Sequence, residues 1–290
     1  MKAKVFYTKN IDKNSLVKIY DALNTELKGN VAIKISTGEP GGHNFLDPML
    51  IKDLVQKLNG TIVECNTAYQ GKRYNSEDHW QAIKDHGFMD IAKCDIMDEE
   101  GEMELEIPNG KRIKKNYVGS HMKKYDSMLI LSHFKGHAMG GFGGALKNMS
   151  IGIASSHGKA YIHGAGDVNH LWDAEHDLFL ESMADADASV IKYFGKDNLA
   201  YISVANNLSV DCDCDNDPSD PEMNDIGIFA SLDPVALDQA CYDAVKNSND
   251  SGKTSLIERM DSRNAIHTVE AASDLGLGVR EYEIFDIDEM

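Results

Sequence analysis

The chain has 290 residues, of which 42% are hydrophobic and 26% charged, as is ordinary for a globular protein. Its 47 acidic residues outnumber 29 basic ones, and the net charge of −18 argues against nucleic acid or anionic lipid as a partner. No apolar run approaches the roughly 18 residues that span a bilayer, and the first residues lack an apolar signal core. We therefore predict a cytoplasmic protein with no membrane segment.

The first ninety residues alternate segments with strand and helix patterns. The predicted elements are strands at 3–7, 31–36 and 61–65, and helices at 15–27, 47–58 and from 76 to about 87. Asp47 and Pro48 form a cap and first-turn pair, and Gly60 follows the end of that helix. This alternation predicts a parallel sheet with right-handed crossovers.

The rest of the chain continues the pattern after one interruption. Residues 103–107 alternate in polarity and precede Asn109-Gly110, which predicts an antiparallel hairpin insertion at about 102–118. The later predicted elements are strands at 128–132, 199–204, 226–231 and 279–285, and helices at 167–187, 233–246 and 263–275. We predict one α/β domain over residues 1–290, with a mainly parallel, Rossmann-like sheet between two layers of helices.

One stretch, LILSHFKGHAMGGFGGALKNMSIGIASSHGKAYIH at 129–163, reads as strand, glycine-rich loop and helix. In α/β proteins this order places backbone close to a ligand at the carboxyl edge of the sheet. The glycines match neither a dinucleotide fingerprint nor a Walker loop. A tight turn without a ligand is the alternative, but we favour ligand binding by Gly140, Gly141, Gly143 and Gly144.

Lys147 and Asn148 follow the glycines, in the first turn of the predicted helix. A lysine beside the positive end of a helix has a lowered pKa and favours an anionic or covalent partner. The alternative for Lys147 is a solvated surface position. Asn148 could donate to a ligand or cap a turn.

Four histidines, His133, His137, His157 and His163, surround the same loop. Each alone could be a hydrogen-bonded loop residue, but together they indicate a binding site. His43, in the loop GEPGGHNFL after the second strand, should face the same edge and could join them. Asn66, Tyr69 and Lys72 are weaker candidates from the loop after the third strand.

The cysteines are few and scattered, and their odd number in a cytosolic chain predicts reduced thiols. Cys212 and Cys214 form a C-x-C pair that we expect to be too short for a comfortable disulfide. Such a pair suits metal or redox use, with further ligands from aspartate or histidine. No ferredoxin-type cluster is expected, because no C-x-x-C-x-x-C run is present. We expect Cys65, Cys94 and Cys241 to pack in the core.

The segments HFKGHAMGGFGGALKNMSIGIASSHGK, DCDC and DIGIFASLDPVALDQACYD resemble the domain of unknown function 362 family. That resemblance spans nearly the whole chain and implies a prokaryotic protein of a family often labelled as iron–sulfur centre proteins. Many members carry an inserted two-cluster ferredoxin module, whose cysteines this chain lacks.

HAMGGFGGALK, at 137–147, is also distantly similar to the core motif of the nickel-pincer lactate racemase N-terminal domain. This similarity implies an acid/base role for His137 and a cofactor-tethering or phosphate-contacting role for Lys147. His163 would ligate a metal or act as a base. A shared fold with a different ligand is the alternative.

Two functional hypotheses follow. The first is an enzyme, racemase-like or redox-related, that binds a small anionic ligand or cofactor, with or without a divalent metal. Its catalytic residues would be His137, Lys147 and His163. Its binding residues would be His43, His133, Gly140, Gly141, Gly143, Gly144, Asn148 and His157. The second hypothesis is a metal- or iron–sulfur-related accessory protein that uses Cys212 and Cys214 with a redox partner. The sequence is also compatible with a homo-oligomer.

Overall fold

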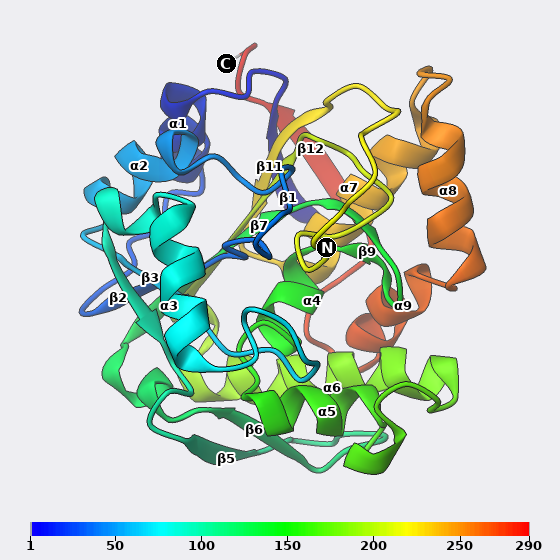
Figure 1. The fold of residues 1–290 in the computed structure, drawn as a ribbon. Helices are drawn as coiled ribbons and strands as arrows, with labels where there is room; N and C mark the ends of the chain where they lie inside the picture. The colour runs from blue at the N-terminus through cyan, green and yellow to red at the C-terminus, as the bar shows by residue number, and fades with distance from the viewer. Residues whose placement is uncertain (1, 290) are drawn as a thin grey trace.

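The computed structural model describes residues 2–289, and its centre is an eight-stranded sheet (Figure 1). The strand order is β12-β1-β11-β10-β7-β2-β3-β4. The strands are β1 (Ala3–Thr8), β2 (Val31–Lys34), β3 (Thr61–Glu64), β4 (Lys93–Ile96), β7 (Ser127–His133), β10 (Leu199–Ala205), β11 (Gly227–Ser231) and β12 (Tyr282–Asp286). Only β11 runs antiparallel to its neighbours in this sheet. The predicted mainly parallel sheet is confirmed.

Helices cover both faces of the sheet, which gives the predicted three layers (Figure 1). The helices are α1 (Lys13–Ala22), α2 (Pro48–Lys57), α3 (Ser76–Asp85), α4 (Ala145–Ser150), α5 (Ser156–His163), α6 (His176–Phe194), α7 (Pro234–Asn247), α8 (Lys253–Ser262) and α9 (Ile266–Asp274). Alternate residues of β7 enter different cores: Ile130 packs with α4 and α6, whereas Leu129 and Leu131 pack with α1 and α2. This alternation follows from the pleat of a strand buried on both faces.

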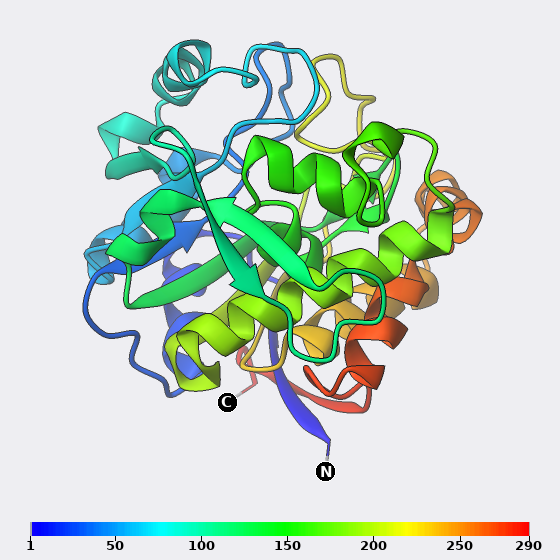
Figure 2. The ribbon, with the colours of Figure 1, turned by 90° about the horizontal axis from the view of Figure 1, so that it is seen from below.

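The predicted hairpin is confirmed as β5 (Glu102–Glu106) paired antiparallel with β6 (Lys115–Gly119). The hairpin lies across α5 and α6 on the outside of the molecule (Figure 2). Asp185 of α6 anchors its loop by accepting hydrogen bonds from the backbone of Lys111, Arg112 and Ile113. A buried carboxylate with three such donors fixes the loop against the helix.

Some predicted boundaries are wrong. The helix expected at 167–187 begins only at His176, because Glu175 caps its N-terminus, and it continues to Phe194 before Gly195. Strand β4 was missed, since an edge strand with exposed Lys93 has little apolar pattern. Helix α8 was also missed. None of the helices within residues 2–289 is long and apolar enough to cross a membrane.

Four parallel strands, β2, β3, β7 and β10, end at the same edge of the sheet. Their loops, at 35–47, 65–75, 134–144 and 206–226, therefore meet there. The glycine-rich segment in the third loop forms a small antiparallel pair, β8 (Lys135–His137) with β9 (Gly141–Gly143). It leads into α4, so the loop and α4 both border the carboxyl edge.

Candidate functional site

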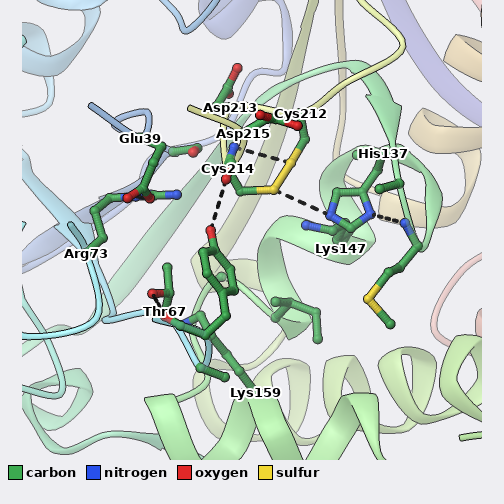
Figure 3. A pocket seen from close by; sticks show the side chains of 18 of the residues that line it. Glu39, Thr67, Arg73, His137, Lys147, Lys159, Cys212, Asp213, Cys214 and Asp215 are labelled. Atoms are coloured by element: carbon green, nitrogen blue, oxygen red, sulfur yellow. Dashed lines mark hydrogen bonds and ion pairs between the residues drawn. A yellow bond between two sulfur atoms is a disulfide. The ribbon is translucent and has the colours of Figure 1, made fainter. Parts of the chain in front are cut away.

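A cavity of about 550 Å³ lies among these loops (Figure 3). This volume suits a small organic ligand. Of the residues predicted to be catalytic, ligand-binding or metal-binding in the two hypotheses, nine line the cavity: His133, His137, Gly143, Gly144, Lys147, Asn148, His163, Cys212 and Cys214. The three predicted catalytic residues, His137, Lys147 and His163, therefore line one cavity, although their chemical roles stay a prediction.

His137 is held as a neutral imidazole that carries its hydrogen on Nε2. Its Nδ1 accepts hydrogen bonds from the backbone N–H groups of Met139 and Gly140, at 3.1 and 2.9 Å. An acceptor at Nδ1 leaves Nε2 as the N–H donor of the neutral ring. Burial, followed by the neighbouring Lys147, lowers the pKa of His137 well below its ordinary value. His137 can therefore donate a hydrogen bond into the cavity.

His163 has the opposite arrangement. Its Nδ1 lies 2.8 Å from the carbonyl oxygen of Lys159, so Nδ1 carries the hydrogen and donates it. The ring stacks on Phe179 with centroids 4.7 Å apart. Burial lowers the pKa of His163 to about 4. At neutral pH its Nε2 therefore has a free lone pair, as a base or a metal ligand requires.

Lys147 lies in the first turn of α4, as predicted, but the cause of its lowered pKa differs. Burial, then repulsion from Lys135, Lys34 and Lys159, lowers this pKa to about 7. The end of α4 is not free, because the carboxylate of Asp238 accepts hydrogen bonds from the first two backbone N–H groups of the helix. These two N–H groups are therefore already paired within the protein.

His133 lines the cavity but is committed to the protein. Its Nδ1 lies 2.9 Å from Asp213 and its Nε2 lies 2.6 Å from the carbonyl oxygen of Asn206. The other carboxylate oxygen of Asp213 binds Lys135 at 2.5 Å. Although burial opposes this, the contacts with His133 and Lys135 hold the pKa of Asp213 well below its usual range. His133 therefore positions the loop after β10, rather than a ligand.

A second ion-pair network forms the neighbouring wall of the cavity. Glu64 binds Lys34 at 2.9 Å and Arg73 at 3.3 Å, and Arg73 also binds Glu39 at 2.8 Å. All four side chains are buried. Although burial opposes ionisation, the two cations lower the pKa of Glu64 to about 2. These four residues were not predicted; the available signal was a lysine inside the apolar strand VAIKIS.

Lys159 also lines the cavity, and it was not predicted as a site residue although it lies within the segment 129–163. Its amino group donates to the carbonyl oxygen of Ala154 at 2.6 Å, and burial lowers its pKa. Within residues 2–289 neither Lys147 nor Lys159 has a carboxylate partner. The cavity of this acidic protein therefore contains two lysines without a counter-ion.

The four glycines serve different purposes. A Cβ at Gly141, whose φ is +76°, would lie 2.4 Å from Ala265, so Gly141 allows packing against the chain after α8. A Cβ at Gly144 would strike the Asp238 carboxylate that caps α4. Gly143 lines the cavity and has open space around it, whereas Gly140 and Gly141 do not line it. Ligand contact stays a proposal for Gly143 and Gly144.

Asn148 reaches the cavity, but its amide nitrogen contacts the carbonyl oxygens of Lys34 and Leu131 and the hydroxyl of Ser132. It ties α4 to the ends of β2 and β7. His43 and His157 do not line the cavity, contrary to expectation. Each has an exposed side chain turned to a carboxylate, Asp220 for His43 and Glu102 for His157, both at 3.0 Å.

Cys212 and Cys214 are joined by a disulfide, with Cα atoms 5.2 Å apart. The expectation that this pair is too short for a comfortable disulfide is wrong, because that separation lies inside the usual range of about 4.4–6.8 Å. The disulfide lines the cavity, and the sulfur of Cys214 lies 3.8 Å from Nε2 of His137 (Figure 3).

Apolar and aromatic side chains also line the cavity. Trp172 is 65% exposed, and its ring centroid lies 6.4 Å from that of Tyr69. Leu171 and Met139 also line the cavity. The hydroxyl of Tyr69 donates to the carbonyl oxygen of Cys214 at 3.1 Å, which links the loop after β3 to the disulfide. Tyr69 was a weak candidate, and it does line the site.

The model of the domain of unknown function 362 (DUF362) matches residues 31–243. The chain belongs to this family. No curated protein matches it. Lactate racemase apoprotein from Thermoanaerobacterium thermosaccharolyticum is similar at 16% identity and a TM-score of 0.48, over 83% of this chain and 56% of that one. A Thermotoga maritima protein is similar at 11% identity and a TM-score of 0.48, over 81% and 58%. The chain spans less than two thirds of either.

The iron–sulfur label of the DUF362 family can be compared with the donors present. Among residues 2–289, the donor atoms of His137, Cys212 and Cys214 lie within 4.8 Å of one another. Cys65 also lines the cavity, but its thiol donates to the carbonyl oxygen of Ile153 at 3.2 Å. One histidine and a disulfide do not fit a four-thiolate cluster.

Proposed function

We propose that this DUF362 protein is an enzyme that binds a small organic anion in the cavity and transfers a proton at the bound molecule. One observation carries the proposal: Lys147 and Lys159 line the cavity without a carboxylate partner within residues 2–289. Three other cations that line the cavity, Lys34, Arg73 and Lys135, each contact a carboxylate.

A carboxylate or phosphate is the ligand that this imbalance favours. Burying an amino group in its charged form costs free energy unless an opposite charge lies nearby. That cost is visible in the lowered pKa values of Lys147 and Lys159. A bound anion would supply the missing partner and would favour the charged form of both lysines.

Proton transfer is supported by the complementary states of the two histidines. His163 offers the lone pair of Nε2 as a base, and His137 offers the hydrogen of Nε2 as a donor. Lys147, with a pKa of about 7, can hold or release a proton at neutral pH. His163 would remove a proton from the bound anion, while Lys147 and His137 stabilise the negative charge that develops.

A second candidate, a metal-handling accessory protein, is favoured by the cluster of His137, Cys212 and Cys214. If reduced, the pair could hold a divalent metal with Nε2 of His137 as a third donor. The hydrogen bonds to Nδ1 of His137 oppose this, because they keep the hydrogen on Nε2. The acid–base function therefore ranks first.

The test is calorimetric titration of the protein with malonate and with inorganic phosphate. We expect at least one of them to bind, and Lys147→Met to weaken that binding by about tenfold or more, or about 1.4 kcal/mol. Lys123→Met is the matched control, because Lys123 is an exposed lysine outside the cavity. Equal affinities in the wild type and Lys147→Met would overturn the anion site.

Proton transfer is tested separately by incubating short hydroxy and keto acids with the protein in D2O. Nuclear magnetic resonance then detects deuterium at their carbon positions. We expect incorporation with the wild type and little with His163→Gln. Incorporation that is unaffected by both His163→Gln and Lys147→Met would assign the chemistry to other groups.

A further inference from the structure

We propose that the Cys212–Cys214 disulfide is a reactive redox centre, and that it exchanges with small thiols that carry a negative charge. This inference rests on the anion-binding cavity proposed above and names one class of molecule for it. Both cysteines line that cavity, in the loop between β10 and β11.

The two sulfurs are held at different depths. Cys212 is 8% exposed, whereas Cys214 is more open. A thiolate inside the cavity therefore reaches the sulfur of Cys214 first. The loop itself is fixed, because the backbone N–H of Glu39 donates to the carbonyl oxygen of Asp213 at 2.7 Å and Tyr69 donates to that of Cys214. A fixed loop keeps the two sulfurs close when the bond between them opens.

Each sulfur already has a hydrogen-bond donor. The backbone N–H of Cys214 lies 3.2 Å from the sulfur of Cys212. Nε2 of His137, which carries its hydrogen, lies 3.8 Å from the sulfur of Cys214 (Figure 3). Donors of this kind stabilise a thiolate and so favour it as the leaving group in exchange.

The charges around the disulfide favour an anionic thiol. Asp211 and Asp213 flank Cys212, but Asp211 pairs with Arg259 at 3.2 Å and Asp213 pairs with Lys135. Lys147 lines the same cavity without a carboxylate partner among the described residues. Asp215 is the remaining acidic neighbour that lines the cavity, and it opposes this preference.

The exchange takes two thiolates and two steps. The thiolate of a first molecule attacks the sulfur of Cys214, the disulfide bond breaks, and its electron pair goes to the sulfur of Cys212. A second thiolate attacks the ligand sulfur of the mixed disulfide and releases Cys214. The products are a small-molecule disulfide and a protein dithiol, which has taken two electrons and the two thiol protons. The reverse reaction oxidises the dithiol.

The experiment measures the exchange rate of the oxidised protein with 3-mercaptopropionate, 2-mercaptoethanol and cysteamine at pH 7 and low salt. Each rate is divided by that of the same thiol with 2-hydroxyethyl disulfide, which removes differences in intrinsic thiol reactivity. Mixed disulfides at residues 212 and 214 are identified by alkylation and peptide mass spectrometry, so that Cys65, Cys94 and Cys241 do not contribute.

We expect the anionic thiol to react about tenfold faster than the neutral one, and the cationic thiol to be slowest. The net charge of −18 by itself favours the reverse order. Lys147→Met should reduce the preference, Lys123→Met should preserve it, and Asp215→Asn should increase it. An unreactive disulfide, or a preference for cysteamine, would overturn the inference.

Malonate separates this inference from the proposed function. Malonate that binds the oxidised protein should slow exchange with 3-mercaptopropionate by competition. Calorimetric binding of malonate without any charge preference in exchange would contradict the redox inference and leave the anion site intact. Absence of anion binding in calorimetry, with rapid exchange of all three thiols, would contradict the anion site instead.

Discussion

The two walls of the cavity differ in how their charges are satisfied. The paired wall consists of Lys34, Glu39, Glu64, Arg73, His133, Lys135 and Asp213, and each of its charged groups contacts an opposite charge. The open wall consists of His137, Lys147, Lys159 and His163, which have no carboxylate partner within residues 2–289.

This difference separates structural residues from residues available for chemistry. On the paired wall, buried charges neutralise one another and hold the ends of β2, β3, β7 and β10 together. These groups therefore offer little unsatisfied charge to a ligand. Lysines that are removed from water without a partner reduce stability, and such groups are common at functional sites of proteins. The two walls should therefore respond in opposite ways to the removal of one charge.

The largest effect is expected on the paired wall. Asp213→Asn would leave Lys135 and His133 buried without their shared carboxylate, at a cost of about 3–5 kcal/mol. The free energy of unfolding, measured by urea denaturation at pH 7, checks this. A loss below about 0.5 kcal/mol, within the range of surface substitutions, would show that Asp213 does not hold the wall.

Acid should weaken the same wall. The pKa of Glu64 is about 2 in the folded protein against an ordinary 4.5, so its stabilisation is complete above pH 4.5 and is lost as the pH falls toward 2. This one group should account for about 2 kcal/mol of lost stability at pH 3. Urea midpoints of Glu64→Gln should fall less between pH 6 and pH 3 than those of the wild type. Parallel curves would refute the assignment.

On the open wall, removal of a charge should stabilise the protein. The pKa of Lys147 is about 7 when folded and 10.5 when unconstrained, so the unfolded chain binds this proton more tightly. Lys147→Met should therefore raise the free energy of unfolding at pH 7, by about 4 kcal/mol at most. The gain should shrink toward pH 10.5, where the unfolded lysine also loses its proton.

Lys123→Met is the control for that gain, since it removes one positive charge from an exposed position. Its free energy of unfolding should stay within about 0.5 kcal/mol of the wild type. An equal gain in both variants would mean that net charge, rather than the buried site of Lys147, causes the stabilisation.

Local pattern was sufficient to predict most of the fold. Apolar runs such as 128–132 mark strands that are buried on both faces, and Asp47-Pro48 marks the start of α2. The local sequence pattern did not predict elements whose presence or boundary depends on tertiary contacts. β4 is an exposed edge strand, and the start of α6 depends on a cap by Glu175 rather than on its apolar spacing.

Three of the four residues of the open wall, His137, Lys147 and His163, were predictable because they lie close in sequence beside glycines. The paired wall was not, because its ion pairs join residues far apart, such as Asp213 with Lys135. A contact between residues far apart in sequence also explains why the prediction for His43 failed. His43 follows a correctly predicted strand, but its side chain contacts Asp220 instead of the cavity. A disulfide between Cys212 and Cys214 depends on a loop conformation that spacing does not reveal.

The most direct measurement is the titration of the Lys147 side chain by nuclear magnetic resonance of labelled lysine, with Lys147→Met to assign the signal. Without an added anion it should titrate near pH 7, because burial and the neighbouring lysines disfavour its charge. Malonate or phosphate should move that titration to higher pH. A Lys147 that titrates near 10.5, and that no added anion affects, would contradict an open cationic wall.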